Sequence, residues 1–218
     1  MICGDVDGKT QLCLRAATSR TFQLLAAVDL QTSFYAKKDA TPLAEGTVCV
    51  HGEPTIPCIT TSAAGTGTLF AVPTDTDQLI SFEKPGFTKV LCSFGRQQQE
   101  TAFSYRIPSD SDLAAIFTAA GLTQKSGTGV VTLSVLEANA GLAGATATLG
   151  AAADGPFYAN AEGMPDKSLS KTGAAGTLSW MNVPEGTLEL TVAPGSGRTC
   201  VPLNAWGTGV GGKFQLKV

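Results

Sequence analysis

The sequence predicts an all-β protein made of two antiparallel β-sandwich domains joined by a linker with one short α-helix. Three observations carry this prediction. A block of sequence occurs twice, strand-like segments surround both copies, and one amphipathic segment separates them. The predicted parts are an N-terminal segment at 1–19, a first sandwich at 20–107, a helical linker at 108–125 and a second sandwich at 126–218.

The repeated block begins at Thr61 and again at Thr172, 111 residues later. In both copies a Gly follows the Thr by four residues, a Val by eleven and a Pro by twelve. Gly65 and Gly176 suit a turn because glycine adopts positive φ without a Cβ penalty. β-branched and aromatic residues then indicate a strand, which the proline ends because it cannot donate to a ladder. The repeat therefore indicates two copies of one domain.

Further strands are predicted around the repeated block. In the first domain they cover residues 22–28, 47–50 and 79–82, with more strand sequence near 89–92 and up to 105. In the second domain residues 131–135, 187–192 and 213–218 alternate between apolar and polar side chains, as half-buried strands do. Residues 1–19 are predicted to be polar and irregular.

One α-helix is predicted between the copies. Ser109 can cap its start, and Asp112 three residues later completes a variant of the capping box. Gly121 supplies the stop at the end. The apolar stripe at i, i+3, i+4 and i+7 consists of Leu113, Ile116, Phe117 and Ala120. Because such a stripe must be covered, we expect the helix to dock against a sandwich.

The order of these features resembles the carboxypeptidase regulatory-like domain, a transthyretin-like β-sandwich. The matching segments are 42–50 with 61–87 and 141–149 with 172–192. Each copy has a strand, a Leu-Ala segment, Thr-x-x-x-Gly, and a strand that ends in Val-Pro. The resemblance implies tandem domains of this family in a secreted bacterial protein. It implies no peptidase activity, because the peptidase that names the family carries its catalytic residues in another domain.

Composition and charge limit the classes of partner. Charged residues make up 15% of the chain, the formal net charge is −3, and no basic stripe occurs, so no nucleic-acid partner is expected. No apolar run approaches the roughly 18 residues that a membrane span needs. The sequence therefore predicts neither a nucleic-acid partner nor a membrane span.

The six cysteines indicate disulfides. An even number in small β domains is typical of an oxidising compartment, and no CxxC motif is present. Cys49 and Cys58 flank a turn-rich segment and are the favoured pair, although six cysteines allow 15 connectivities. The other candidates are Cys3, Cys13, Cys92 and Cys200. Cys3 can pair with Cys13 or another cysteine, and a lipid anchor on Cys3 is a less favoured alternative, as is a cytosolic protein with six buried thiols.

No set of residues amounts to a catalytic or metal site. His51 is the single histidine, which excludes multi-histidine zinc and iron centres, and no G-x-S-x-G motif is present. Asp5 and Asp7 begin like a calcium loop, but the other ligands do not follow. We therefore predict no catalytic residue, no metal and no cofactor. A hydrolase that uses His51 is the least favoured alternative.

An insertion distinguishes the second copy. The copies align at an offset of 99 residues at Leu43 and Leu142 but of 111 at the repeated Thr, so the second copy carries about 12 extra residues within 150–170. Aromatic residues and Met are favoured in contact surfaces. The predicted interaction residues are Asp154, Phe157, Tyr158, Met164 and Asp166. The favoured interpretation is that Phe157 and Tyr158 fold back and cover the edge of their own sandwich, and the alternative is that the loop is an interaction surface.

These observations predict a non-catalytic secreted or cell-surface protein with a structural or protein-interaction role, in the periplasm or on the outer surface of a bacterium. Its expected partners are other protein domains or components of a surface assembly. The alternative is a carbohydrate- or ligand-binding module that acts in adhesion or beside a secreted enzyme. Trp206 is then the aromatic that can face a glycan, because Trp180 falls on a predicted core strand.

Overall fold

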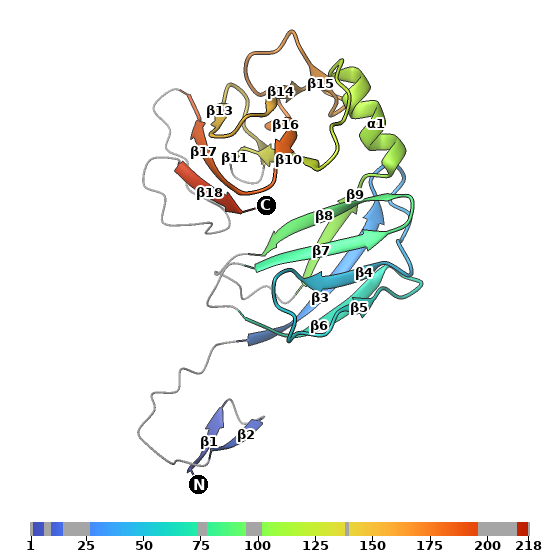
Figure 1. The fold of residues 1–218 in the computed structure, drawn as a ribbon, viewed down its shortest axis with the longest axis vertical. Helices are drawn as coiled ribbons and strands as arrows, with labels where there is room; N and C mark the ends of the chain where they lie inside the picture. Colours follow the sequence, from blue (N-terminus) through green and yellow to red (C-terminus); the bar gives the residue numbers. More distant parts are fainter. Residues whose placement is uncertain are drawn as a thin grey trace.

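The structure, a computed structural model, describes residues 2–6, 10–14, 27–73, 78–94, 102–137, 140–195 and 213–217. Its strands form two β-sandwiches, and one α-helix, α1 (Asp110–Ala119), connects them (Figure 1). The protein is therefore mostly β, as the sequence predicts. Among the described strands, every pairing is antiparallel except that of β3 with β9.

The first sandwich, called copy one, has two facing sheets. One sheet has the order β6-β3-β9, with β3 at Ala27–Ala36, β6 at Thr66–Pro73 and β9 at Ala102–Ile107. The other has the order β5-β4-β7-β8, with β4 at Thr47–Val50, β5 at Ile59–Thr60, β7 at Gln78–Lys84 and β8 at Phe87–Phe94. Apolar side chains from both sheets meet between them, and the rings of Phe34 and Phe82 stack with their centroids 4.5 Å apart.

The second sandwich, called copy two, repeats this plan. One sheet has the order β10-β16-β14-β15, with β10 at Thr128–Ser134, β14 at Asp154–Ala159, β15 at Pro165–Asp166 and β16 at Thr177–Pro184. The other has the order β13-β17-β18, with β13 at Thr146–Leu149, β17 at Thr187–Ala193 and β18 at Lys213–Lys217. A short hairpin of β11 (Leu136–Glu137) and β12 (Ala140–Gly141) precedes β13. Copy two has its own core, in which Trp180 is buried.

The repeated Thr makes the same pair of hydrogen bonds in both copies. Thr61 Oγ1 donates to the carbonyl of Leu43 at 2.6 Å and accepts from the amide of Gly46 at 2.8 Å. The equivalent bonds in copy two join Thr172 Oγ1 to the Leu142 carbonyl at 2.6 Å and to the Ala145 amide at 2.9 Å. This Thr clamp fastens the turn that precedes the repeated strand to the segment that leads into β4 or β13, and it supports the interpretation of a doubled domain.

The copies differ in where each adds a strand. β3 with β6 corresponds to β10 with β16, and β4 with β7 corresponds to β13 with β17. Copy one places β9 beside β3, whereas copy two places β14 and β15 beside β16. Among the described strands, β6 is consequently an edge of its sheet, and the equivalent strand β16 is not.

One prediction near the N-terminus is wrong. Residues 1–19 are not all irregular, because β1 (Ile2–Val6) pairs antiparallel with β2 (Thr10–Leu14). The Asp-Gly dipeptide between them is typical of a hairpin turn and was a signal for this pairing. The first described strand of copy one is β3, which includes the end of the predicted strand at 22–28 and continues to Ala36, and residues 22–26 lie outside the described part of the chain. Leu30, Thr32 and Phe34 alternate into the core, and this period of two sets the position of β3.

Candidate functional site at the junction of the two copies

The helix α1 begins with a complete capping box. The backbone amide of Asp112 donates to Ser109 Oγ at 3.1 Å, and the amide of Ser109 donates to Asp112 Oδ2 at 2.9 Å. The Ser109 amide and the Ser109 hydroxyl both donate to Asp112 Oδ2 and lower the pKa of this carboxyl group, and the positive charges of Lys38 and Lys37 lower it further. The predicted start of the helix is therefore confirmed.

The end of α1 has the predicted stop at Gly121, where φ is +62°. The Gly121 amide donates to the Thr118 carbonyl, and the Leu122 amide donates to the Phe117 carbonyl, both at 2.9 Å. This pair of bonds is a Schellman motif, which also brings Leu122 to the apolar cluster that contains Phe117. The chain leaves the helix in one defined direction.

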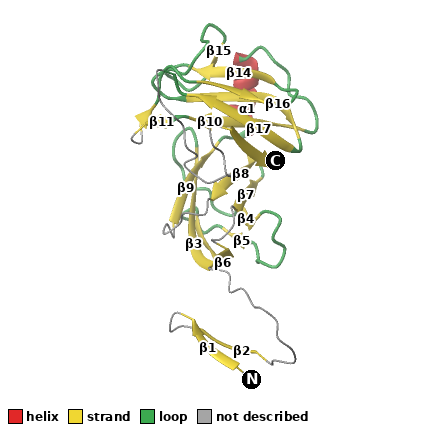
Figure 2. Ribbon diagram, turned by 90° about the vertical axis from the view of Figure 1, so that its left-hand side faces the viewer, coloured by secondary structure: helices red, strands yellow, loops and turns green. Residues whose placement is uncertain are grey.

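The apolar stripe of α1 packs on copy two, so the predicted docking is confirmed (Figure 2). Phe117 and Ala120 are buried against Met181 of β16. Trp180, the preceding residue on the strand, belongs to the inner core of copy two, because neighbouring residues of a strand face opposite sides. The residues that surround this contact are Leu113, Ile116, Leu122, Val130 and Phe157.

A buried amide next to Met181 fastens the linker. Asn182 lies in an irregularity of the β10–β16 pairing and has a φ of +53°, which Asn tolerates better than most residues. Its Oδ1 accepts from the Lys125 amide at 2.8 Å and from Thr128 Oγ1 at 3.2 Å. Its Nδ2 donates to Asp154 Oδ2 at 2.8 Å and to the Thr123 carbonyl at 3.1 Å. One side chain thus joins the linker, β10, β14 and β16.

Asp154 carries the charge of this cluster. Its hydrogen bond from Asn182 lowers the pKa of its carboxyl group, and the positive charge of Lys125, whose Nζ lies 3.5 Å from Oδ2, lowers it as well. Sequence reasoning missed Asn182. A signal existed, because Asn182 is a polar residue between Met181 and Val183 in a run that is otherwise apolar.

The start of α1 is attached to copy one by backbone hydrogen bonds. The amide of Asp110 donates to the Gly86 carbonyl, and the amide of Thr88 donates to the Pro108 carbonyl, both at 3.1 Å. Gly86 and Thr88 lie at the hairpin between β7 and β8. The helix is therefore held by copy one at its first residue and by copy two along its apolar stripe.

A hollow of about 240 Å³ lies in this junction. Its lining combines two lysines, two carboxylates and apolar groups. It consists of Lys37 and Lys38 from the segment after β3, Asp112, Ala115 and Ile116 from α1, and Glu162, Gly163 and Met164 from the turn between β14 and β15. The hollow thus offers charges of both signs together with the apolar side chains of Ala115, Ile116 and Met164.

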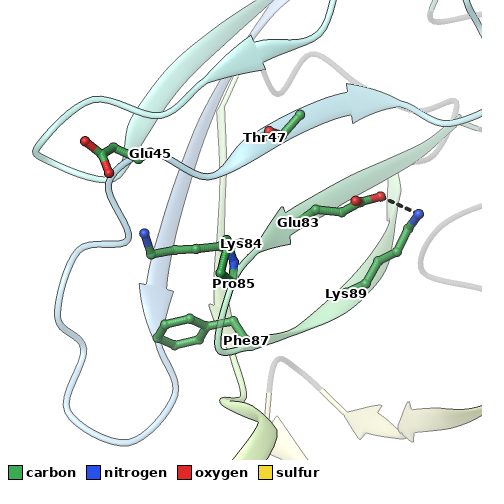
Figure 3. Close-up of a pocket in the computed structure, with 7 residues that line it drawn as sticks. All are labelled: Glu45, Thr47, Glu83, Lys84, Pro85, Phe87 and Lys89. Carbon is green, nitrogen blue, oxygen red and sulfur yellow. Dashed lines mark ion pairs between the residues drawn. The ribbon is translucent and has the colours of Figure 1, made fainter.

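A second hollow, of about 350 Å³, lies over the β4-β7-β8 sheet of copy one (Figure 3). Glu83 forms an ion pair with Lys89, and Lys84 Nζ donates to the Ala44 carbonyl at 2.7 Å. Figure 3 shows the Phe87 ring below the Lys84 side chain. The full lining is Glu45, Thr47, Glu83, Lys84, Pro85, Phe87 and Lys89. It offers charges and hydrogen bonds to a polar ligand, but these seven residues include no histidine and no Ser or Cys nucleophile.

The predicted interaction residues mostly belong to the sheet. Asp154, Phe157 and Tyr158 lie in β14, which pairs with β16, so they do not form a projecting loop, and the interpretation in which the two aromatics cover their own sandwich is confirmed. Tyr158 is in the core of copy two with 5% of its surface exposed, and Phe157 packs next to α1. The physical reason is that two aromatics and an open sheet edge are both covered when the insertion folds back. Met164 lines the junction hollow, and Asp166 in β15 accepts a bond from the Ser168 amide at 2.8 Å.

The cysteine predictions have mixed outcomes. Cys49 and Cys58 form the expected disulfide. Cys92 is a buried free thiol and not half of a disulfide, and burial raises its pKa to about 12. Cys3 and Cys13 are backbone partners in the β1–β2 pairing. Cys200 and the predicted ligand-facing Trp206 lie outside the described residues.

The remaining candidates for chemistry are isolated. His51 is exposed in the turn after β4, where its amide donates to the Leu79 carbonyl at 2.7 Å. In the part of the chain that the structure describes, no group of three or more His, Cys, Asp or Glu side chains is placed to hold a metal ion. Among the described residues, no helix has the length and apolar character needed to cross a membrane.

No protein-family model matches the sequence, and no curated protein matches it. Among solved structures, the chain is similar to the Bacillus anthracis TIE protein, with 13% identity and a TM-score of 0.30 over 87% of this chain and 31% of that one. It is also similar to a Streptococcal ancillary pilin, with 11% identity and a TM-score of 0.25 over 88% of this chain and 59% of that one. The chain thus spans less than two thirds of either protein, and likeness at this level carries no argument about function.

Proposed function

We propose that the chain is a non-catalytic structural protein, secreted or on a bacterial cell surface, in which α1 holds two β-sandwich modules in a fixed arrangement. The observation that carries this proposal is the attachment of α1 at both ends. Copy one binds its first residue through Gly86, and copy two buries Phe117 and Ala120. Modules on a flexible linker move independently of each other. A linker that packs against one module and is hydrogen-bonded to the other instead holds the two modules in one relative orientation.

The Asn182 cluster supports the same role. Its four hydrogen bonds fix residues 123–128, the part of the linker that follows α1. A buried amide group destabilises the fold if one of its hydrogen-bond partners is lost. A linker that only separated two modules would not need such a group. The cluster therefore serves the arrangement of the two copies.

The proposed location rests on the disulfide between Cys49 and Cys58. Disulfides persist in oxidising compartments and are rare in the cytosol. This bond closes a short loop between β4 and β5. The expected partners are other protein domains or components of a surface assembly.

Nuclear magnetic relaxation of backbone amides tests the fixed arrangement. Both copies should share one rotational correlation time in the wild-type chain. A matched variant with a six-residue Gly-Ser insertion after Gly121 should give each copy its own shorter time, because the Schellman turn no longer leads into the Asn182 cluster. Independent tumbling of the wild-type copies would overturn the proposal, as would turnover in a hydrolase screen that one point mutation abolishes.

A ligand-binding module is the second candidate, and the hollow in Figure 3 favours it. The Phe87 ring, the Thr47 hydroxyl and the exposed Glu45 carboxylate lie around one open space, as a small polar ligand or glycan would require. Glycan-array binding that falls on Glu45→Ala and Thr47→Ala, but not on Glu53→Ala in the neighbouring turn, would favour this function. Absence of binding would leave the structural role.

A further inference from the structure

The strands β6 and β16 occupy the same place in the two copies but have different neighbours. β16 pairs with β10 on one side and with β14 on the other. Among the described strands, β6 pairs only with β3, so it is the edge of this sheet. The edge that copy two covers with its own insertion therefore has no described strand paired with it in copy one.

A second difference falls at the same point. Phe70 of β6 and Met181 of β16 are equivalent by the 111-residue offset, and each precedes a residue with positive φ, Ala71 at +56° and Asn182 at +53°. Met181 is 0% exposed beneath α1 and next to Phe157, whereas Phe70 is 61% exposed. Phe70 is the most exposed of the large apolar side chains in the described part of the chain.

The edge of β6 has no charged side chain to oppose strand pairing. Natural edge strands often carry Lys or other charges, but none of the eight residues of β6 is charged. The positive φ of Ala71 does not prevent pairing of the residues before it, because β14 pairs with β16 up to Met181, directly before the equivalent Asn182. The paired residues there are Tyr158 with Leu178, Phe157 with Ser179 and Asp154 with Met181.

We propose that β6 is an interface between two copies of this chain, in which the two β6 strands pair antiparallel across a two-fold axis. The β6 strand of a second molecule can take the place beside β6 that β14 takes beside β16 in copy two. Like β14, it is an extended strand that brings an aromatic side chain to the edge. The absence of charge means that the two-fold axis places no like charges opposite each other. The exposed Phe70 of each molecule is then covered by the strand of the other.

Sedimentation equilibrium of the full chain, over about 1 to 300 μM, tests the proposal. The weight-average mass should rise with concentration from that of a monomer towards twice that value. Thr68→Lys places ammonium groups near each other across the axis, and Phe70→Lys removes the aromatic contact and adds a charge. Each should raise the dimer dissociation constant at least tenfold.

The matched control is Thr132→Lys, which puts the same charge at an exposed Thr on β10, an edge strand of copy two. This variant should dimerise as the wild type does. Hydrogen exchange at residues 66–70 should slow as concentration rises, which a contact elsewhere would not produce. A monomer at every concentration overturns the proposal, and so does a dimer that survives both β6 changes or is lost in the β10 control.

Discussion

The two sandwiches share their turns and differ in what lies against their repeated strand. The Thr clamp has nearly the same bond lengths in both, 2.6 and 2.8 Å at Thr61 against 2.6 and 2.9 Å at Thr172. By contrast, Met181 lies beneath a helix and Phe70 lies in solvent. The turn is a local requirement of the fold in each copy, whereas the outer side of the strand is free to serve different contacts.

The residue after each of these positions shows how one conformation serves two purposes. Ala71 and Asn182 both have positive φ, but only Asn has a side chain that tolerates and uses it. At Ala71 the exposed backbone amide donates to Asp29 Oδ1 at 3.2 Å, and no side chain reaches out. At Asn182 the same backbone conformation places the side-chain amide where it hydrogen-bonds to Lys125 of the linker. A strand irregularity of the fold became the attachment point of the junction in copy two alone.

The largest expected effect comes from the turn glycines, where the two copies should respond alike. In Gly65→Ala the new Cβ would lie 2.5 Å from the Phe34 carbonyl oxygen, and in Gly176→Ala it would collide with that of Val135. Both obstacles are backbone atoms that cannot turn away, and φ is positive at both sites. Each change should destabilise its own copy by at least about 3 kcal/mol, measured by hydrogen exchange of core amides in each sandwich.

Gly52→Ala is the control for these turns. Gly52 has a φ of +83°, but no atom lies within 4 Å of the Cβ position. Its cost should be that of the left-handed conformation alone, about 1–2 kcal/mol. An equal cost at Gly52 and Gly65 would show that the close approach of the backbone is unimportant.

The Thr clamps should come next and should again be equal. Thr61→Val and Thr172→Val keep the shape but leave a buried amide and a buried carbonyl without this partner, which should cost about 2–3 kcal/mol in each copy. Chemical denaturation monitored by hydrogen exchange of the core amides gives the free energy of unfolding of each copy separately. Thr118→Val, whose hydroxyl bonds to the Ala114 carbonyl on the exposed side of α1, should change stability by less than about 0.5 kcal/mol. A large difference between the two clamps would contradict their equivalence.

Substitution by glycine at the two strand irregularities should change the stability of the two copies in opposite directions. Ala71→Gly removes a side chain from a left-handed conformation and should stabilise copy one by up to about 1 kcal/mol. Asn182→Gly relieves the same conformation but leaves the amide of Lys125 and its neighbours without their partner, so copy two should lose about 2 kcal/mol. Thermal unfolding followed by Trp180 fluorescence reports copy two. Stabilisation by both changes would show that the Asn182 cluster contributes nothing.

The features that the sequence predicted correctly have local causes. The turn at Gly65, the proline that ends β6, and the two caps of α1 each depend on residues within a few positions of one another. The repeat strengthened the strand predictions, because the same residue types recurred at one offset. The bridge between Cys49 and Cys58 also closes a short loop, so its turn-rich sequence was informative.

The features that were missed depend on contacts between distant segments. The parallel pairing of β9 with β3 joins residues about 70 positions apart, and no local pattern specifies it. The insertion at 154–159 has turn residues and aromatics, which suit an exposed loop and an edge strand equally, and the open side of β16 decides between them. Asn182 is informative only once Thr123, Lys125 and Asp154 are placed around it.

The smallest predicted effect is a loss of stability at low pH, which should affect the start of α1 but not the cores of the two copies. Asp112 has a lowered pKa in the folded chain because it accepts bonds from Ser109, so its contribution to stability is complete above its ordinary pKa of 3.8 and is lost as the pH falls through the lowered value. The apolar cores of both copies have no such dependence. Asp112→Ala should remove about 1 kcal/mol from α1 at neutral pH, whereas Asp112→Asn keeps an acceptor and should remove less. Amide chemical shifts of residues 109–122 should therefore titrate below pH 4 in the wild type while core signals of both copies stay unchanged, and neither variant should show the Asp112 transition. The prediction fails if the chemical shifts of residues 109–122 stay constant down to pH 2, or if they titrate identically in Asp112→Asn. Either result would mean that the hydrogen bonds at Gly86 and Thr88, and not the capping box, stabilise the start of α1.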